Sequence, residues 1–275
     1  MRSRPRAAAA LLPLALAVLP ACDISVGQLA GRATEEWMHT YPLSPGGTLR
    51  IGNTNGMVDV EGTDGTKVEI RAEKIARAAT DSAARELLPR ITIKEDATPD
   101  RVSIETEKWN GMLLGAGFEV RYHVRAPRNA VFDVETTNGG IRLTDLTGRV
   151  LARTTNGGVR AKGLSGGVDA RSTNGGVVVD MASLGKDPLM LRTTNGGVTL
   201  YVPESAKADL TASWTNGGMN VESGLKVEVS EQSRRRFAGR MNGGGTPVEL
   251  HTTNGGIRIQ PRSQADTDSD ERDRQ

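Results

Sequence analysis

The chain contains few aromatic residues and only one cysteine. Phe, Trp and Tyr make up 3% of its 275 residues, so a core must be built from Val, Leu, Ile and Ala in thin layers. A narrow stack of repeats satisfies this requirement better than a thick sandwich. The single cysteine, Cys22, excludes an internal disulfide and a cysteine-based metal cluster.

An excess of charge of one sign is also absent. The chain has 35 basic and 33 acidic residues, and three of the basic ones lie in an N-terminal segment that we expect to be removed. The remaining 32 basic and 33 acidic residues do not indicate nucleic acid as a partner. The histidines form no metal-binding motif, so we expect no metal ion and no cofactor; they are His39, His123 and His251.

The main apolar run of the chain is too short to be a transmembrane helix. It spans Ala7–Leu19, whereas roughly 20 apolar residues are needed to cross a bilayer. The run follows a positively charged start, as the apolar part of a signal peptide does; the charges are Arg2, Arg4 and Arg6.

The segment after this run resembles a bacterial lipobox, in which a signal peptidase cuts before a cysteine that receives lipid. It reads Leu19-Pro20-Ala21-Cys22. We therefore expect a signal peptide at residues 1–21, lipid on Cys22 and a lipid-anchored linker at residues 22–43. The mature protein would be a membrane-anchored lipoprotein of the cell envelope, facing the periplasm or the cell exterior.

Glycine, by contrast, is abundant, and much of it occurs in a repeated turn. The chain has 33 glycines, and an Asn-Gly pair recurs at Asn55, Asn138, Asn156, Asn174, Asn195, Asn216, Asn242 and Asn254. In all of these units except that of Asn242, the residues six and four positions before the Asn and three and five positions after it are apolar. We interpret the Asn242 unit as part of an insertion between Asn216 and Asn254.

This spacing predicts two strands per unit, each with alternate residues buried, joined at the Asn-Gly turn. Asn and Gly tolerate a positive φ, and the second Gly of the turn lets neighbouring backbones approach closely. Two architectures satisfy the pattern: a β-solenoid, whose coils stack laterally, and an antiparallel β meander, in which each Asn-Gly is a hairpin tip. We favour the solenoid because stacking would align identical asparagines in a hydrogen-bonded ladder. Its members would be Asn55, Asn138, Asn156, Asn174, Asn195, Asn216 and Asn254.

The part of the chain before the serial repeats is less regular. One short helix is predicted at residues 76–88, an Ala-rich stretch that Pro89 would end. Strands are predicted at 91–94, 101–107 and 118–125. The predicted fold class is therefore all-β with one short helix, in a single repeat domain at residues 44–262. The polar segment 263–275 is predicted to be disordered.

The order of these motifs resembles that of the bacterial putative-adhesin domains. The resemblance covers residues 44–261: a lead-in SPGGTLRIGNTNGMVDVEG, a strand–helix–strand interlude, then VRYHVRAPRNAVFDVETTNGGIRL and serial TTNGGV units. It implies a β-strand repeat domain of the kind found on lipoproteins and other envelope proteins. The family has no known molecular function, and it supplies no catalytic residues.

Five arginines are predicted to form one outward-facing patch. They stand three positions before or four positions after the Asn in successive units, and they are Arg142, Arg153, Arg160, Arg171 and Arg192. Like charges at this spacing repel one another unless carboxylates or an anionic ligand offset them. Asp133, Glu135 and Asp169 could supply the carboxylates. The patch is thus either a solvated face or a binding site for an anionic polymer.

The sequence contains no convincing active site. Gly163–Gly167 matches the G-x-S-x-G nucleophile motif, but a turn that recurs in each unit explains it equally well. We therefore predict a non-enzymatic binding, adhesion or structural module. Its partner would be an anionic envelope polymer, a glycan or a surface protein. The alternatives are a carbohydrate-active solenoid enzyme, which requires clustered carboxylates, and a scaffold or sensor of envelope stress.

Overall fold

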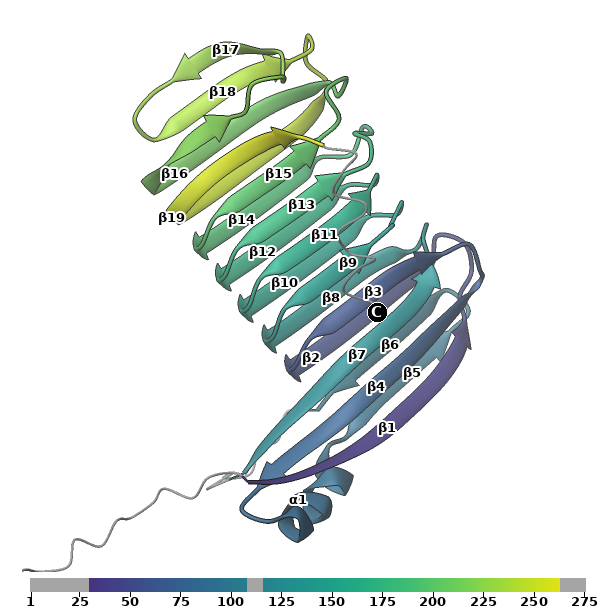
Figure 1. Ribbon diagram of the computed structural model, residues 1–275. Helices are drawn as coiled ribbons and strands as arrows, with labels where there is room; N and C mark the ends of the chain where they lie inside the picture. The colour runs from purple at the N-terminus through teal and green to yellow at the C-terminus, as the bar shows by residue number, and fades with distance from the viewer. Residues whose placement is uncertain (1–29, 108–115, 263–275) are drawn as a thin grey trace, which may run out of the picture.

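The computed structural model describes residues 30–107 and 116–262 (Figure 1). The predicted signal peptide, Cys22 and the predicted disordered segment 263–275 lie outside these residues. The described chain is mostly β-strand, with one short α-helix and one 3-10 turn. Within this part of the chain, no helix has the length and apolar character needed to cross a membrane.

Each repeat unit forms one coil of a β-solenoid. The strand that ends at the Asn lies in one layer, which we call the leading layer, and the strand after the Gly pair lies in a second, the trailing layer. Equivalent strands of neighbouring coils pair in parallel and in register, so that Asn156 is aligned with both Asn138 and Asn174. This parallel pairing confirms the predicted solenoid and excludes the antiparallel meander for the repeat units.

The leading layer forms one side of the stack. In spatial order it contains β5 (Ile93–Thr98), β6 (Arg101–Thr106), β2 (Thr48–Asn55), β8 (Val131–Asn138), β10 (Val150–Asn156), β12 (Val168–Asn174), β14 (Leu189–Asn195), the first half of β19 (Thr246–Pro261), the first half of β16 (Ala208–Val221), β18 (Arg236–Met241) and β17 (Val227–Gln232). The terminal strands β5, β18 and β17 are antiparallel to their neighbours.

The trailing layer forms the other side. Its strands are β1 (Gly31–Pro42), β4 (Lys67–Ala78), β7 (Gly117–Pro127), β3 (Val58–Thr63), β9 (Ile141–Thr144), β11 (Val159–Leu164), β13 (Val177–Met181), β15 (Val198–Val202) and the second halves of β19 and β16. Because β16 and β19 continue through the Asn-Gly turn, the two layers belong to one 19-stranded sheet.

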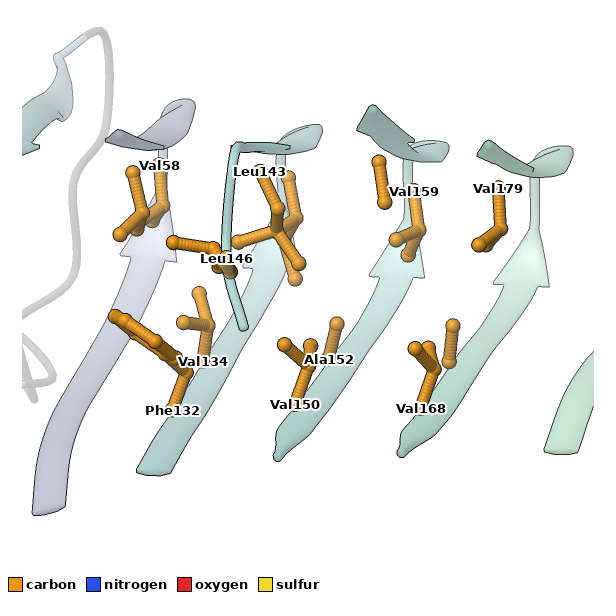
Figure 2. Close-up of a cluster of buried hydrophobic side chains, with 14 of the residues drawn as sticks. Val58, Phe132, Val134, Leu143, Leu146, Val150, Ala152, Val159, Val168 and Val179 are labelled. Atoms are coloured by element: carbon orange, nitrogen blue, oxygen red, sulfur yellow. The ribbon is translucent and has the colours of Figure 1, made fainter. Parts of the chain in front are cut away.

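The core lies between the two layers and is thin: in each coil it is filled by the inward side chains of that coil's two strands. In the coil of Asn156, for example, Val150, Ala152 and Val159 are completely buried. Figure 2 shows Val150 and Ala152 on one strand facing Val159 on the other. Small branched side chains fill this narrow interior at high density without the aromatic residues that the sequence lacks.

The order of the coils in space differs from their order along the chain. The last unit, β19, lies between β14 and β16, so the coil of Asn216 is at the end of the stack. The hairpin β17–β18 then extends the leading layer beyond β16 (Figure 1). Asn242 lies in the turn after β18, which confirms that its unit belongs to an insertion.

Residues 31–42, predicted as part of a linker, are a strand of the fold. They form β1, which pairs antiparallel with β4 from one end to the other. The ordered domain therefore begins well before the predicted residue 44. The predicted strands at 101–107 and 118–125 correspond to β6 and β7, and the one at 91–94 corresponds to β5, which begins and ends later than predicted.

The helix is shorter than predicted. Helix α1 spans Asp81–Leu87 and is followed by a 3-10 turn at Leu88–Arg90, whereas residues 76–78 belong to β4. Ala76 and Ala78 are buried at alternate positions of that strand, and tertiary packing overrides their helix propensity. The helix begins after Thr80, whose side chain accepts a hydrogen bond from the Ala83 N–H.

Candidate functional site

The seven repeat asparagines form a row of side-chain hydrogen bonds along the turn edge of the stack. At each step, Nδ2 of one Asn donates to Oδ1 of its neighbour at 2.7–2.9 Å. In spatial order the row is Asn55, Asn138, Asn156, Asn174, Asn195, Asn254 and Asn216. Each Asn donates to the Asn that precedes it in this order. Asn216, in the last coil, therefore donates its Nδ2 to Asn254, and its Oδ1 accepts no hydrogen bond from another Asn of the described residues.

A second row, two positions before each Asn, was not predicted. There a buried hydroxyl donates to the carbonyl oxygen of the first turn glycine of the neighbouring coil, at 2.7–3.3 Å. The donors are Thr136, Thr154, Ser172, Thr193 and Thr252. A hydroxyl at such an inward position would otherwise be an unsatisfied polar group in the core. The first Thr of the TTN motif was the available signal, because strand alternation places it facing inward.

Different residues occupy this position at the two ends of the stack. In the first coil it is Asn53, whose Nδ2 donates to Val120 O at 2.8 Å and to Gly56 O at 3.1 Å. In the last coil it is Trp214, which is nearly buried and whose backbone N–H donates to Arg235 O. Both residues replace the repeated hydroxyl where the stacking of equivalent coils stops.

The first glycine of each turn is required by close contact between coils. A Cβ on Gly157 would lie 2.0 Å from Gly139 O, and one on Gly175 would lie 2.1 Å from Gly157 O. The second glycine has more room, since a Cβ on Gly176 would lie 3.5 Å from Gly197 O. The prediction that the second glycine permits the close approach is therefore wrong.

The repeat asparagines do not need a positive φ. Among the described residues other than glycine, only Asp145 and Asn242 have one. The recurrence of Asn in every unit is therefore explained by the side-chain ladder and not by a positive φ, in contrast to what the turn preference of Asn suggested.

The five arginines of the predicted patch lie on two different faces. Arg153, Arg171 and Arg192 are aligned on the outer face of the leading layer, and Arg142 and Arg160 are aligned on the outer face of the trailing layer. The buried faces of the two layers point towards each other, so their outer faces point apart and the core separates the two groups. The prediction of one compact patch is therefore wrong.

Four of these arginines are paired with carboxylates. The pairs are Arg171–Asp169, Arg192–Glu249, Arg153–Asp133 and Arg142–Asp59, with N–O distances of 2.7, 2.9, 3.6 and 3.7 Å. Arg171 makes two hydrogen bonds to Asp169, and this hydrogen bonding raises the pKa of the Arg171 guanidinium. The pairs offset the repulsion between stacked arginines, as a solvated face requires.

The leading-layer arginines line a shallow groove that crosses several coils. The groove has a volume of about 430 Å³ and extends along the arginine row from Glu135 to His251. Its other side is formed by the threonines directly before the Asn, namely Thr155, Thr173 and Thr194. Guanidinium and hydroxyl groups therefore recur along the groove at the strand spacing of about 4.8 Å.

Neither the candidate metal ligands nor the G-x-S-x-G segment forms a site in the described residues. These residues contain no group of three or more His, Cys, Asp or Glu side chains able to hold a metal ion. Ser165 of the G-x-S-x-G segment lies in a turn between β11 and β12, and its N–H donates to Leu146 O of the neighbouring coil at 3.1 Å. This is a turn that stacks from coil to coil, and it accounts for the motif.

Residues 123–260, from β7 to β19, match the family described as Toastrack DUF4097. The chain belongs to this family. No curated protein matches the chain. The parallel stack of the Toastrack domain agrees with the predicted membership of a putative-adhesin repeat family, whose molecular function is unknown.

The Toastrack chain is also similar to solved bacterial structures. One is a putative cell adhesion protein from Clostridium sporogenes, with 12% sequence identity and a TM-score of 0.42; the similarity covers 83% of this chain and 100% of that one. Another is a putative adhesin from Bacteroides fragilis, with 11% identity and a TM-score of 0.42; it covers 82% of this chain and 97% of that one.

The Toastrack match does not include the N-terminal end of the stack, where three rings on β1 join the two layers. Trp37 and His39 stack with their ring centroids 4.3 Å apart. Glu95 on β5 accepts a hydrogen bond from the Tyr41 hydroxyl, and its Oε2 lies 3.0 Å from His39 Nδ1. Burial and this hydrogen bond raise the pKa of Tyr41. The cluster closes this end because β1 and β5 are the last strands of their layers.

Proposed function

We propose that this Toastrack protein is a lipid-anchored envelope protein whose solenoid binds an extended polymer without catalysing a reaction. The support for the anchor is the lipobox-like segment that ends at Cys22, preceded by a charged start and an apolar run. The stretch from Cys22 to Gly31, where β1 begins, spans at most about 30 Å when fully extended. Lipid on Cys22 would hold the N-terminal end of the stack within that distance of the membrane.

The observation that supports binding is the groove on the leading layer. It presents the same kinds of hydrogen-bonding group once per coil, at Arg153, Arg171 and Arg192 and at the neighbouring threonines. A polymer lying along the stack could use these groups repeatedly. Small substrates, by contrast, are usually held in deeper, mostly apolar pockets.

The ion pairs favour a hydroxyl-rich glycan as the polymer over a densely anionic one. The guanidinium groups of the groove already form ion pairs with the carboxylates of Asp133, Asp169 and Glu249. These carboxylates would repel the charges of an anionic chain. Sugar hydroxyl groups can donate to these carboxylates and accept hydrogen bonds from the remaining guanidinium N–H groups. A glycan therefore uses both charges of each pair.

The same pairs fit binding better than glycoside hydrolysis. A glycosidase needs one protonated carboxyl group as the acid and a second carboxylate as nucleophile or base. Beside the groove, two residues before lining residues of the same strands, the carboxylates of Asp133, Asp169 and Glu249 are each engaged by an arginine, which suits a fixed binding surface.

The anchor is tested with Cys22→Ser. This variant should no longer incorporate labelled palmitate and should leave the membrane fraction or remain unprocessed, because no other thiol is present in the chain. Acylation that persists in the variant would exclude Cys22 as the lipid site.

Polymer binding is tested on a glycan array with the detergent-solubilised protein. The triple variant Arg153→Ala, Arg171→Ala, Arg192→Ala should lose the bound glycans, whereas the control Arg142→Ala, Arg160→Ala on the opposite face should retain them. Equal loss in both variants, or a wild-type protein that binds no polymer, would contradict the proposal. Binding restricted to anionic polymers, with a steep decrease as salt rises, would identify an anionic ligand instead.

A further inference from the structure

The last coil of the stack, that of Asn216, is covered along only part of its length. Strand β16 pairs with β19 from Ala208 to Val221, but with β18 only from Ala208 to Ser213. A Cβ added to Gly218 would meet nothing within 4 Å, whereas one on the equivalent Gly158 would lie 3.1 Å from Gly176 O. Residues 216–221 are therefore an open edge of the trailing layer, at the end of the stack farthest from β1 (Figure 1).

In the inner coils, fixed backbone groups connect each coil to the next. The Gly157 N–H donates to Asn174 O, and the Val159 N–H donates to Gly176 O, both at 2.9 Å. The same two bonds recur from coil to coil, at the first turn glycine and at the residue two positions later.

At the open edge, the equivalent groups have no following coil to bond. They are the N–H groups of Gly217 and Met219, which by the parallel pairing point away from β19. The asparagine ladder leaves Asn216 Oδ1 as an additional acceptor on the same side. The edge therefore offers the hydrogen-bonding groups for one more parallel strand.

Beside this edge, the leading layer extends two strands beyond the trailing layer, as β18 and β17. Val229 on β17 shares the inward face with Val227 and the buried Met241, yet it is 52% exposed because no trailing strand lies opposite. Met219 and Val221 are only half-buried, whereas the equivalent residues of the other coils are buried. We call the surface formed by Met219, Val221, Val227 and Val229 the C-terminal notch.

We propose that the C-terminal notch binds one extended segment of a partner protein, which adds to β16 as a new strand of the trailing layer. In strand addition, main-chain hydrogen bonds supply affinity and alternate side chains supply specificity. The segment matches residues 216–221 in length and has apolar side chains at alternate positions, which cover Val229 and Met219. A side-chain amide or hydroxyl at its start donates to Asn216 Oδ1.

The two-strand extension of the leading layer excludes a second copy of this chain as the occupant. If two copies paired through their open edges, each trailing layer would continue into the other. Strands β18 and β17 of each copy, which reach about 10 Å beyond β16, would then occupy the space of the other copy's leading layer. The opposite end of a second copy does not fit the notch either, because its trailing layer extends only one strand beyond its leading layer, as β1, whereas the step left by β18 and β17 is two strands deep. An extended peptide has no second layer and avoids this clash.

The probe for this test is a fluorescent peptide, TTNGGVTLY, with the sequence of residues 193–201, which has the turn and the apolar alternation of one coil. Titrated with the full-length protein in detergent, it should bind saturably. Met219→Pro removes an outward N–H and leaves the pairing with β19 intact, so it should weaken binding by about tenfold or more. Val229→Lys places a charge in the notch and should weaken binding similarly.

The control is Thr211→Lys, an exposed residue on the outer face of β16, which should bind the peptide as the wild type does. Thermal melting of each variant verifies that it is folded. The proposal is overturned if the wild-type protein does not bind the peptide, or if both notch variants bind it as well as the control. A dimer in sedimentation velocity that Met219→Pro abolishes would also overturn it, because the occupant would then be a second copy.

Discussion

Asn254 Nδ2 lies 2.8 Å from Asn195 Oδ1, although 59 residues separate them in the sequence. This contact inserts the last unit of the chain into the stack, between β14 and β16. Among the described coils, the Asn216 unit pairs in parallel with β19 alone. It is therefore joined to the stack through β19. Docking of β19 thus completes both the ladder and the C-terminal notch.

The first prediction concerns the asparagine ladder. Asn174→Ala should lower the free energy of unfolding by about 1–3 kcal/mol, because it leaves the amides of Asn156 and Asn195 without their partner. Arg171→Ala, on the same strand, should cost at most about 1 kcal/mol, since it removes a single, partly exposed ion pair. Urea denaturation measures both; equal costs would mean that the ladder adds no stability.

The two glycines of one turn should respond very differently to the same substitution. In Gly175→Ala, the new Cβ would lie 2.1 Å from Gly157 O at a φ of 156°, so we expect a loss of more than about 3 kcal/mol or a failure to fold. Gly176→Ala has ordinary contacts and should change stability by less than about 1 kcal/mol. Comparable thermal melting of the two variants would contradict the close approach at the first glycine.

Adjacent threonines provide a matched test of the buried hydroxyl row. Thr154→Val removes the donor to Gly139 O and leaves that carbonyl unsatisfied inside the stack, at a cost of about 1–3 kcal/mol. Thr155→Val changes an exposed residue and should stay within about 0.5 kcal/mol of the wild type. The row has no energetic role if chemical denaturation shows the two variants to be equally stable.

Alkaline pH should destabilise the fold through Tyr122. Burial raises the pKa of its hydroxyl to about 12 from 10.0, although the hydrogen bond with Thr106 opposes the shift. Between pH 10 and 12 the unfolded chain ionises at this position while the folded chain does not, so the free energy of unfolding falls as pH rises. The contribution is complete below about pH 10 and is lost as pH rises through 12.

Tyr122→Phe removes this titration. Its stability should fall less than that of the wild type between pH 10 and 12, by a difference of roughly 2 kcal/mol. At neutral pH the variant should be slightly less stable, because the Thr106 hydroxyl loses its buried partner. Urea titrations at several pH values measure both effects, and parallel pH profiles would show that Tyr122 does not contribute to alkaline unfolding.

Much of the architecture could be predicted from particular residues. Apolar side chains at fixed distances from each Asn indicated the two strands of a coil, because alternation along a strand is a local property. The failure of this pattern at Asn242 identified the insertion for the same reason. The repetition of identical asparagines indicated parallel stacking, since a hydrogen-bonded row needs its members in register.

The sequence by itself therefore determined the coil, its buried positions and its ladder. Only the tertiary structure decided that β19 precedes β16 in space, that residues 31–42 close the N-terminal end, and that Arg153 and Arg142 face opposite ways. These features depend on which distant strands pair and on which side of the turn a residue stands. Strand pairing is set by contacts between segments far apart in the chain, and a local pattern shared by seven similar units does not distinguish their order.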